Sequence, residues 1–122
     1  MREYRPYLSD ILQRIEMIRE FSAHGRDEFK TSLMQQESVI RSFEVIGEII
    51  KRLPSNLLDE QPDIPWRQFT GFRDVLIHQY NKIDLEVVWD AVENELEPLR
   101  LAVESLLQSL DQASDPDEEE LA

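Results

Sequence analysis

The sequence predicts an all-α protein, an up-and-down bundle of about five helices that pairs with a second copy. Apolar residues recur three and four positions apart through most of the chain, which is the period of an amphipathic helix. No stretch alternates polar and apolar residues over the length of a strand. Only three glycines are present, and most of the six prolines stand where helices should begin or end. With 122 residues the chain has the length of one domain.

The first half of the chain predicts three helices. Gly25 is placed to end the first helix, and residues 27–32 fit a short second one. Ser32 or Thr31 can cap the third helix, which Pro54 closes. The apolar stripes are Leu8, Ile11, Leu12, Ile15, Ile18 and Phe21 in the first helix, and Leu33, Val39, Ile40, Phe43, Ile46, Ile50 and Leu53 in the third.

Gly47 lies inside the apolar stripe of the third helix. A glycine in a helix costs about 1 kcal/mol relative to alanine. The residue is therefore either a tolerated cost or a point where a partner helix comes close, and we favour close approach.

A connector and a fourth helix follow. Residues 54–65 hold three prolines among polar residues and indicate a structured connector. Asp63 can cap the fourth helix, with Pro65 in its first turn, and this helix should run to about Gln79.

The last predicted helix leads into an acidic tail. A turn at 81–83 precedes Asp84, which is a good cap for a fifth helix, and Pro98 must kink or restart that helix. We place the helical bundle in residues 1–110 and expect residues 111–122 to be disordered. Short connections favour antiparallel neighbours, and a bundle this small with several apolar stripes favours burying one face against a second copy.

The charge of the chain argues against a broad nucleic-acid surface. The formal net charge is −13, and the acids of the tail account for fewer than half of it. Proteins that bind nucleic acids non-specifically show the opposite balance, because Lys and Arg must replace counterions on the phosphates. A local basic cleft remains compatible with this composition, since the field depends on arrangement as well as on the sum. The tail acids are Asp115, Asp117, Glu118, Glu119 and Glu120.

Other classes of protein are excluded by what the sequence lacks. There is no cysteine, so disulfides and thiol catalysis are excluded, and with only His24 and His78 we expect no metal site within one chain and no cofactor. No apolar run approaches the length of about 20 residues that spans a bilayer. The first residues have no apolar core like that of a secretory signal, so we expect a cytoplasmic protein.

One segment combines residues suited to a reaction. Residues 71–80 contain Arg73, His78 and Tyr80 near one helix end. Arginine is a permanent cation whose planar fork fits phosphate oxygens, and histidine can accept and donate a proton near neutral pH. These abilities match RNA cleavage by the neighbouring 2′-hydroxyl, in which a base removes the hydroxyl proton and an acid protonates the leaving 5′-oxygen. The cation stabilises the transition state, and no metal is required.

The spacing of this segment supports part of such a site. Asp74 and His78 are four residues apart, so they share a helix face and could form a hydrogen bond that orients the imidazole. Arg73 and His78 are five apart, which separates them by about 140° on an ideal helix. They converge if the arginine reaches around, if the helix loosens, or if a second copy brings them together. A two-fold dimer would also place two imidazoles at one cleft.

Structural roles are the alternative for each of these residues. A histidine in a last helical turn often contacts the terminal carbonyls, an Arg–Asp pair on a helix is often solvated, and a tyrosine past a helix end often packs as a lid. The spacing alone favours these roles. His24, beside Gly25, is better explained as a capping residue, and the acidic tail as solvated chain rather than an ion site.

Several segments together resemble a known family. Arg73-x4-His78-x-Tyr80 matches the motif of HepT-like toxins of the HEPN superfamily. Around it, residues 44–48, 64–73 and 84–89 are similar to the family's E-x-I-G-E, I-P-W-R…G-x-R and last-helix segments, in the same order. The resemblance covers about residues 5 to 110 and leaves the acidic tail outside.

The resemblance implies a fold, an activity and a partner. HEPN proteins are helical bundles that form homodimers, in which Arg73 and His78 would cut RNA without metal and Asp74 would support them. HepT-like members are toxins of type VII-like toxin–antitoxin pairs, and transfer RNA is a substrate that the wider family suggests. A MntA-like nucleotidyltransferase antitoxin silences the toxin by attaching AMP to the motif tyrosine, here Tyr80. The alternatives are a non-catalytic HEPN module that binds a nucleotide or the nucleotidyltransferase, and an acidic helical scaffold with no site.

Overall fold

The computed structural model describes residues 1–112, which are mostly helical and contain no strand. This confirms the all-α prediction. The helices are α1 (Arg5–Ser22), α2 (Arg26–Thr31), α3 (Leu33–Arg52), α4 (Ser55–Leu58), α5 (Trp66–His78), α6 (Leu85–Asn94) and α7 (Leu96–Gln112), with 3-10 turns η1 (Arg2–Tyr4) and η2 (Tyr80–Lys82). The count exceeds the expected five because the connector contains the single-turn α4 and because the last helix is divided in two.

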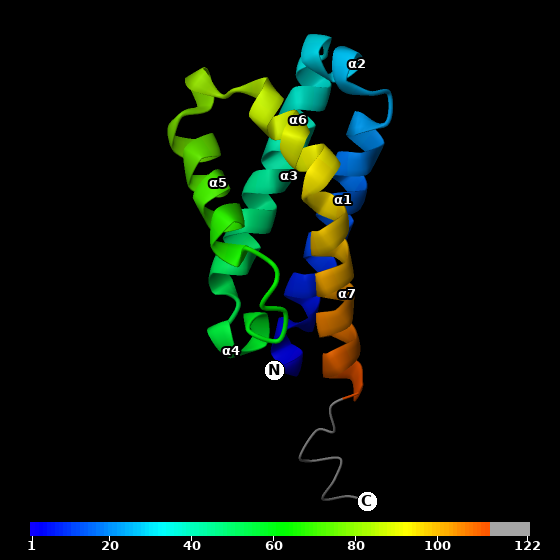
Figure 1. Cartoon of the computed structure of the whole chain (residues 1–122), viewed down its shortest axis with the longest axis vertical. Helices are drawn as coiled ribbons and strands as arrows, with labels where there is room; N and C mark the ends of the chain where they lie inside the picture. The colour runs from blue at the N-terminus through cyan, green and yellow to red at the C-terminus, as the bar shows by residue number, and fades with distance from the viewer. Residues whose placement is uncertain (113–122) are drawn as a thin grey trace, which may run out of the picture.

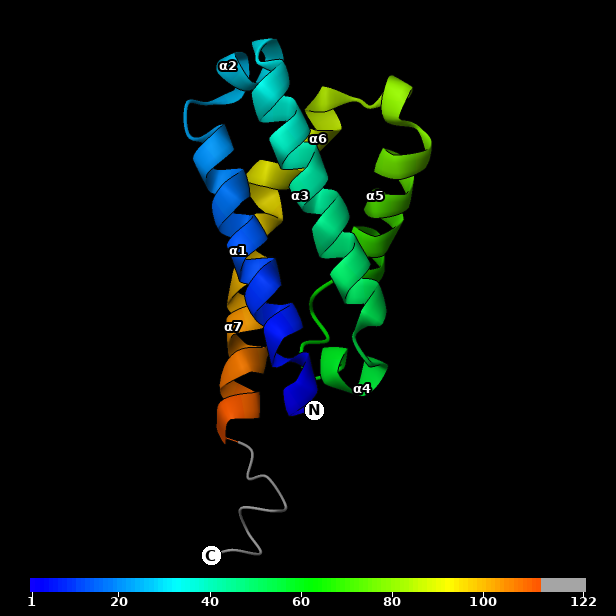
Figure 2. The same ribbon diagram turned by 180° about the vertical axis from the view of Figure 1, so that it is seen from behind.

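The long helices run up and down, with α3 in the middle of the bundle (Figures 1 and 2). α3 packs against α1 on one side and against α5 on the other, and α1 packs in turn against α7. The short α2 and the connection from α5 to α6 lie at one end of the molecule, while α4 and the N-terminus lie at the other (Figure 1). α5 is therefore an outer helix, held mainly through α3.

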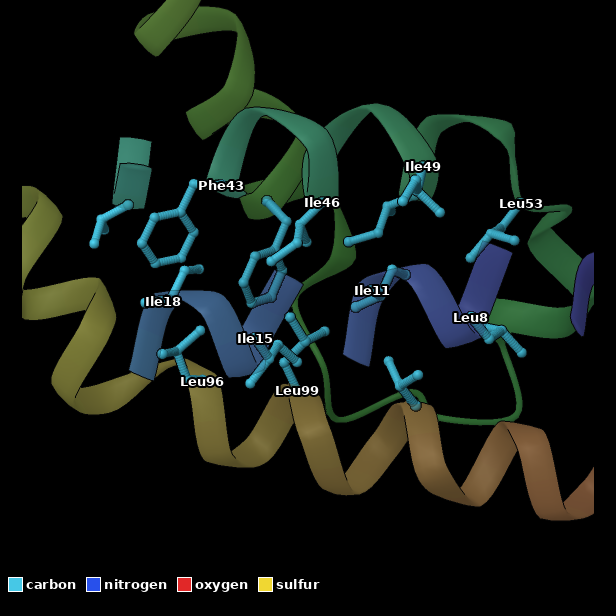
Figure 3. Packing of buried hydrophobic residues seen from close by; sticks show 14 of the residues in the cluster. Leu8, Ile11, Ile15, Ile18, Phe43, Ile46, Ile49, Leu53, Leu96 and Leu99 are labelled. Atoms are coloured by element: carbon cyan, nitrogen blue, oxygen red, sulfur yellow. The ribbon is translucent and has the colours of Figure 1, made fainter. Parts of the chain in front are cut away.

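The core is built from the apolar stripes of α1, α3 and α7 (Figure 3). Full burial of an aliphatic or aromatic side chain contributes about 1.5–3 kcal/mol, so this cluster fixes α3 against α1. The labelled members are Leu8, Ile11, Ile15 and Ile18 from α1, Phe43, Ile46, Ile49 and Leu53 from α3 or its end, and Leu96 and Leu99 from α7.

Helix starts follow the capping residues in two predicted places. The Ser32 hydroxyl accepts a hydrogen bond from the backbone N–H of Gln35 at 3.2 Å. The Asp84 carboxylate accepts one from the backbone N–H of Glu86 at 2.9 Å. Gly25, after the end of α1, adopts a φ of 93°, a backbone conformation that favours glycine.

The prediction that Asp63 caps the fourth helix is wrong. α5 begins only at Trp66, with Pro65 as the N-cap residue and no side-chain cap. The proline fixes its own φ near the helical value and starts the helix without help from a carboxylate. The indole N–H of Trp66 donates instead to the carbonyls of Leu58 and Gln61, each at 3.1 Å, and ties the start of α5 to the connector.

The end of the chain differs in part from the expectation. Pro98 restarts the helix as predicted, because α6 ends at Asn94 and Pro98 falls in the first turn of α7, where its missing N–H is tolerated. The helix then continues past residue 110 to Gln112, and Asp111 pairs with Arg5 through an N–O distance of 2.7 Å. The remainder of the predicted tail, residues 113–122, lies outside the described residues. Within residues 1–112, no helix combines the length and apolarity needed to cross a membrane.

Candidate functional site

α5 lies unusually close to α3 at Gly47. A Cβ atom built on Gly47 would lie 2.8 Å from the carbonyl oxygen of Phe69 and closer still to the Cβ of Arg73. Such distances are shorter than van der Waals contact, so no other residue fits here without moving α5. Gly47 is therefore a point of close approach, as we favoured from the sequence, and the helix that approaches is the one that carries Arg73.

The Arg73 side chain is held between two carboxylates. One terminal nitrogen of its guanidinium donates to Asp74 Oδ1 at 2.9 Å, and the other lies 3.6 Å from Glu48 Oε2. Its Nε is buried and has no hydrogen-bond partner among residues 1–112. The side chain keeps 22% of its surface exposed. The guanidinium is thus turned towards the α5 face that carries Asp74, which is also the face of His78 one helical turn later.

Asp74 is bound to cations and not to His78. Its Oδ1 accepts hydrogen bonds from Lys51 Nζ at 2.8 Å and from Arg73 at 2.9 Å. These two cations, Lys51 first, hold the pKa of Asp74 below its usual value, and Asp74 in turn raises the pKa of Arg73. The hydrogen bond from His78 to Asp74 that the spacing allowed is absent from the described part of the chain, where Asp74 binds Lys51 and Arg73.

Sequence reasoning missed Lys51 and Glu48 as partners of this pair. Both lie on α3, more than twenty positions before Asp74 in the chain. The one signal available was their place within a turn of Gly47, the position predicted for close approach.

His78 and Tyr80 are both exposed at the far end of α5. His78 is the last residue of the helix, and its side chain forms no hydrogen bond or ion pair within residues 1–112. Tyr80 begins the following 3-10 turn with 77% of its surface exposed, so it does not act as a packing lid. The imidazole is free to exchange protons with a bound molecule, and the phenol is reachable from solvent.

A groove of about 420 Å³ lies beside Tyr80, between the first half of α3 and the start of α6. Its lining includes Leu33, Ile40, Arg41, Glu44, Tyr80 and Ile83. Arg41 and Glu44 form an ion pair across 3.6 Å, so this groove presents little net charge from that pair.

The charges of the molecule are divided between its two sides. Residues 66–82, which form α5 and η2, carry Arg67, Arg73 and Lys82 against a single acid, Asp74. Residues 84–112, which form α6 and α7, carry eight acids and Arg100 alone. The segment that carries Arg73 and His78 therefore has an excess of positive charge, although the whole chain is acidic.

The arrangement can bind a phosphate and move a proton. A held guanidinium supplies fixed positive charge, and an exposed imidazole supplies a base or an acid. Within the part of the chain that the structure describes, no group of three His, Asp or Glu side chains could hold a metal ion. His24 lies between α1 and α2 and not on α5, so one copy of the chain offers one imidazole at this site.

Comparison with known proteins gives a consistent picture. The family model described as "Ribonuclease HepT-like" matches residues 11–106. A Thermococcus cleftensis protein named "Probable ribonuclease HepT" is 37% identical over 106 residues, covering 86% of this chain and 96% of the relative. A Methanocaldococcus jannaschii protein named "Gamma-glutamylcyclotransferase and putative RNase" is 36% identical over 111 residues, covering 90% of this chain. The chain covers 50% of the length of that longer protein. No solved structure matches the chain.

Proposed function

The chain belongs to the HepT-like ribonuclease family, and we propose that it is a metal-independent endoribonuclease that cuts RNA through Arg73 and His78. The observation that carries this proposal is the geometry on α5. Asp74 and Glu48 hold the Arg73 guanidinium where α5 meets α3, and the exposed His78 follows one turn after Asp74.

The reaction follows from these two groups. The 2′-hydroxyl of a ribose attacks the adjacent phosphorus while an imidazole takes its proton. The bond from phosphorus to the 5′-oxygen breaks, and that oxygen receives a proton from an acid. The products are a 2′,3′-cyclic phosphate and a 5′-hydroxyl. Arg73 lowers the barrier by stabilising the charge that builds on the phosphate oxygens.

We further propose that the active form is a homodimer. The reaction needs both a base and an acid, and each copy offers only His78 at this end of α5. A two-fold axis next to α5 would bring two imidazoles and two guanidinium groups to one cleft.

Regulation is proposed to act on Tyr80. In this proposal the protein is the toxin of a type VII-like toxin–antitoxin pair, transfer RNA is the substrate, and a MntA-like nucleotidyltransferase attaches AMP to Tyr80. The exposure of Tyr80 supports its accessibility to such an enzyme. The added phosphate would introduce negative charge two residues from His78 and would compete with RNA for the cations of α5.

The cleavage test compares purified wild-type protein with Arg73→Ala and His78→Ala on total RNA, with and without EDTA. Both variants should lose cleavage. They should keep the helical circular-dichroism spectrum, because neither side chain belongs to the buried core. Gln79→Ala, an exposed neighbour, is the matched control and should cleave normally. Cleavage that stops on chelation, or that persists in His78→Ala, would contradict the mechanism. A protein that cuts nothing but binds a nucleotidyltransferase would be the non-catalytic module.

The regulation test uses Tyr80→Phe with a cognate nucleotidyltransferase and ATP. The variant should still cleave RNA but resist silencing, since the hydroxyl that accepts AMP is missing. Mass spectrometry of the wild-type protein should find AMP on Tyr80. Silencing of the variant to the same degree as the wild type would exclude Tyr80 as the modified residue.

A further inference from the structure

Nothing in the described structure explains why position 71, the second helical glycine near the site, is a glycine. Gly71 lies in the interior of α5 and is exposed, and a Cβ atom built on it would meet nothing within 4 Å. Its φ is not positive, so the backbone does not require glycine either. Alanine would form a more stable helix at this position. What glycine provides is an outer surface on which another molecule can come close to the backbone.

Gly71 lies between Arg67 and His78 on one face of α5. Steps of four, three and four residues join Arg67, Gly71, Asp74 and His78, which is the spacing of residues on a single helix face. At a rise of about 1.5 Å per residue, the face extends for about 16 Å from Arg67 to His78. Lys82 lies beyond the end of α5, in the 3-10 turn η2 that follows His78.

Arg67 and Lys82 differ from most cations of this protein. Most Lys and Arg side chains of residues 1–112 pair with a carboxylate, as Arg5 does with Asp111 and Arg26 with Glu86. Arg67 and Lys82 are exposed and have no ion-pair partner in the described part of the chain. Their charge is available to an anionic ligand.

Asp74 is the one acid on this face, and its charge is compensated. Lys51 and Arg73 both donate to its Oδ1, at 2.8 and 2.9 Å. The face therefore offers positive charge along its length in spite of the acidic composition of the whole chain.

We propose that this face of α5 binds the sugar–phosphate backbone of the RNA, with Arg67 and Lys82 contacting phosphates on either side of the cleaved bond. We call Arg67, Gly71 and Lys82 the phosphate track. The strand lies against the bare backbone at Gly71, and a methyl group there would hold it away. This inference rests on the proposed ribonuclease function and adds the residues that bind the uncut part of the substrate.

A second copy of the chain is the other molecule that could lie on Gly71, and Val75, which is 46% exposed on the adjoining face, would suit such a contact. The charges favour RNA. Two copies with these faces in direct contact would bring unpaired cations of the same kind together, so in the proposed homodimer the faces line an open cleft, where a polyanion neutralises them.

The experiment measures the affinity of bulk transfer RNA for the full chain carrying His78→Ala, so that binding is observed without cleavage, over a series of KCl concentrations. Arg67→Gln and Lys82→Gln, each added to this parent, should weaken binding several-fold. Each should also reduce the slope of log affinity against log salt by about 0.7–0.9, the contribution of one phosphate contact. Arg26→Gln on α2 changes the net charge equally at an exposed site away from α5, and should leave the slope unchanged.

Gly71→Ala in the same parent should weaken binding at least fivefold without changing the salt slope, while raising the urea midpoint of unfolding. Gln68→Ala, at an exposed position on another face of α5, is the control and should bind normally. Light scattering after size exclusion gives the oligomeric state of each variant.

The inference is overturned if the parent fails to bind transfer RNA or if Gly71→Ala binds as well as the parent. It is also overturned if the two charge variants behave like Arg26→Gln, or if Gly71→Ala loses binding only because it separates into monomers. The proposed function fails separately. If wild-type protein binds RNA along the phosphate track but does not cut it, the proposed nuclease function is disproved. If Arg67→Gln cleaves RNA with a normal KM, only the phosphate-track inference is disproved.

Discussion

At the scale of single residues, the two helical glycines of the site have opposite surroundings. Gly47 faces Arg73 and Phe69 across a gap too narrow for a Cβ atom, while Gly71 faces open space. The first glycine sets how deeply the Arg73 stem lies between α3 and α5. This burial leaves the guanidinium within reach of Glu48 and Asp74. The orientation of the Arg73 side chain therefore depends on the absence of a Cβ atom at Gly47 of α3.

Gly47→Ala should therefore destabilise the protein, although alanine is the better helix former. Forcing a methyl group into packed space costs about 1–3 kcal/mol, which exceeds the gain in helix propensity of about 1 kcal/mol. Urea unfolding followed by circular dichroism should give a lower midpoint, and RNA cleavage should fall because Arg73 is displaced.

The matched control is Gly71→Ala, the same chemical change at a helical glycine with free space around it. Its unfolding midpoint should move in the opposite direction. An unchanged midpoint for Gly47→Ala would mean that α3 and α5 can separate without loss, and that Gly47 does not position the arginine.

At the scale of secondary-structure elements, the sequence predicted what is local and missed what joins distant segments. The stripes of α1 and α3, the caps Ser32 and Asp84, and the restart at Pro98 follow from periods and short-range chemistry within a few residues. The Lys51–Asp74 contact joins two helices, and no short-range rule reports it. The spacing therefore suggested a hydrogen bond between Asp74 and His78 on the same helix, whereas the structure pairs Asp74 with Lys51 on α3.

The N-cap residue of α6 allows a test of how much a single capping side chain contributes to the stability of the protein. Asp84→Ala removes the carboxylate that accepts the Glu86 N–H, and should lower the free energy of unfolding by about 0.5–2 kcal/mol. Asp84→Asn keeps an acceptor oxygen and should lose much less. The measurement is urea unfolding of the three proteins in parallel. Equal losses for Ala and Asn would indicate that the charge of Asp84, and not its hydrogen bond, stabilises the start of the helix.

At the scale of the whole molecule, the balance of acids and bases differs between α5 and the last two helices. Residues 84–112, which contain α6 and α7, carry eight acids against one arginine, and α5 with η2 carries an excess of positive charge. If the chain acts on RNA as proposed, the RNA would be repelled on the α6–α7 side and attracted to α5, over distances of about 8–10 Å at physiological salt. The uneven charge of an acidic protein can thus favour binding of a nucleic acid at one of its faces, here α5.

The acids of α7 also connect it to α1, and this connection should depend on pH. Glu97 binds Arg100 on its own helix and Arg19 on α1, and these two cations lower its pKa from 4.5 to about 2. A carboxylate with a lowered pKa in the folded state stabilises the fold above its unfolded pKa, and this stabilisation disappears as the pH falls towards the folded pKa. The contribution of Glu97 should be complete at pH 7 and should fade between about pH 5 and pH 2.

Glu97→Gln tests this contribution when its unfolding free energy is subtracted from that of the wild type across the pH range. The difference should favour the wild type at pH 7 and shrink steadily below pH 5, because the glutamate becomes neutral like the glutamine that replaces it. Glu20→Gln, an exposed acid of α1 with no ion pair in residues 1–112, should give a small difference that changes little with pH. High salt should reduce the Glu97 effect, since all three side chains are partly exposed. A difference between wild type and Glu97→Gln that persists at pH 2 would show that Glu97 stabilises α7 by packing rather than by holding it to α1 through charge.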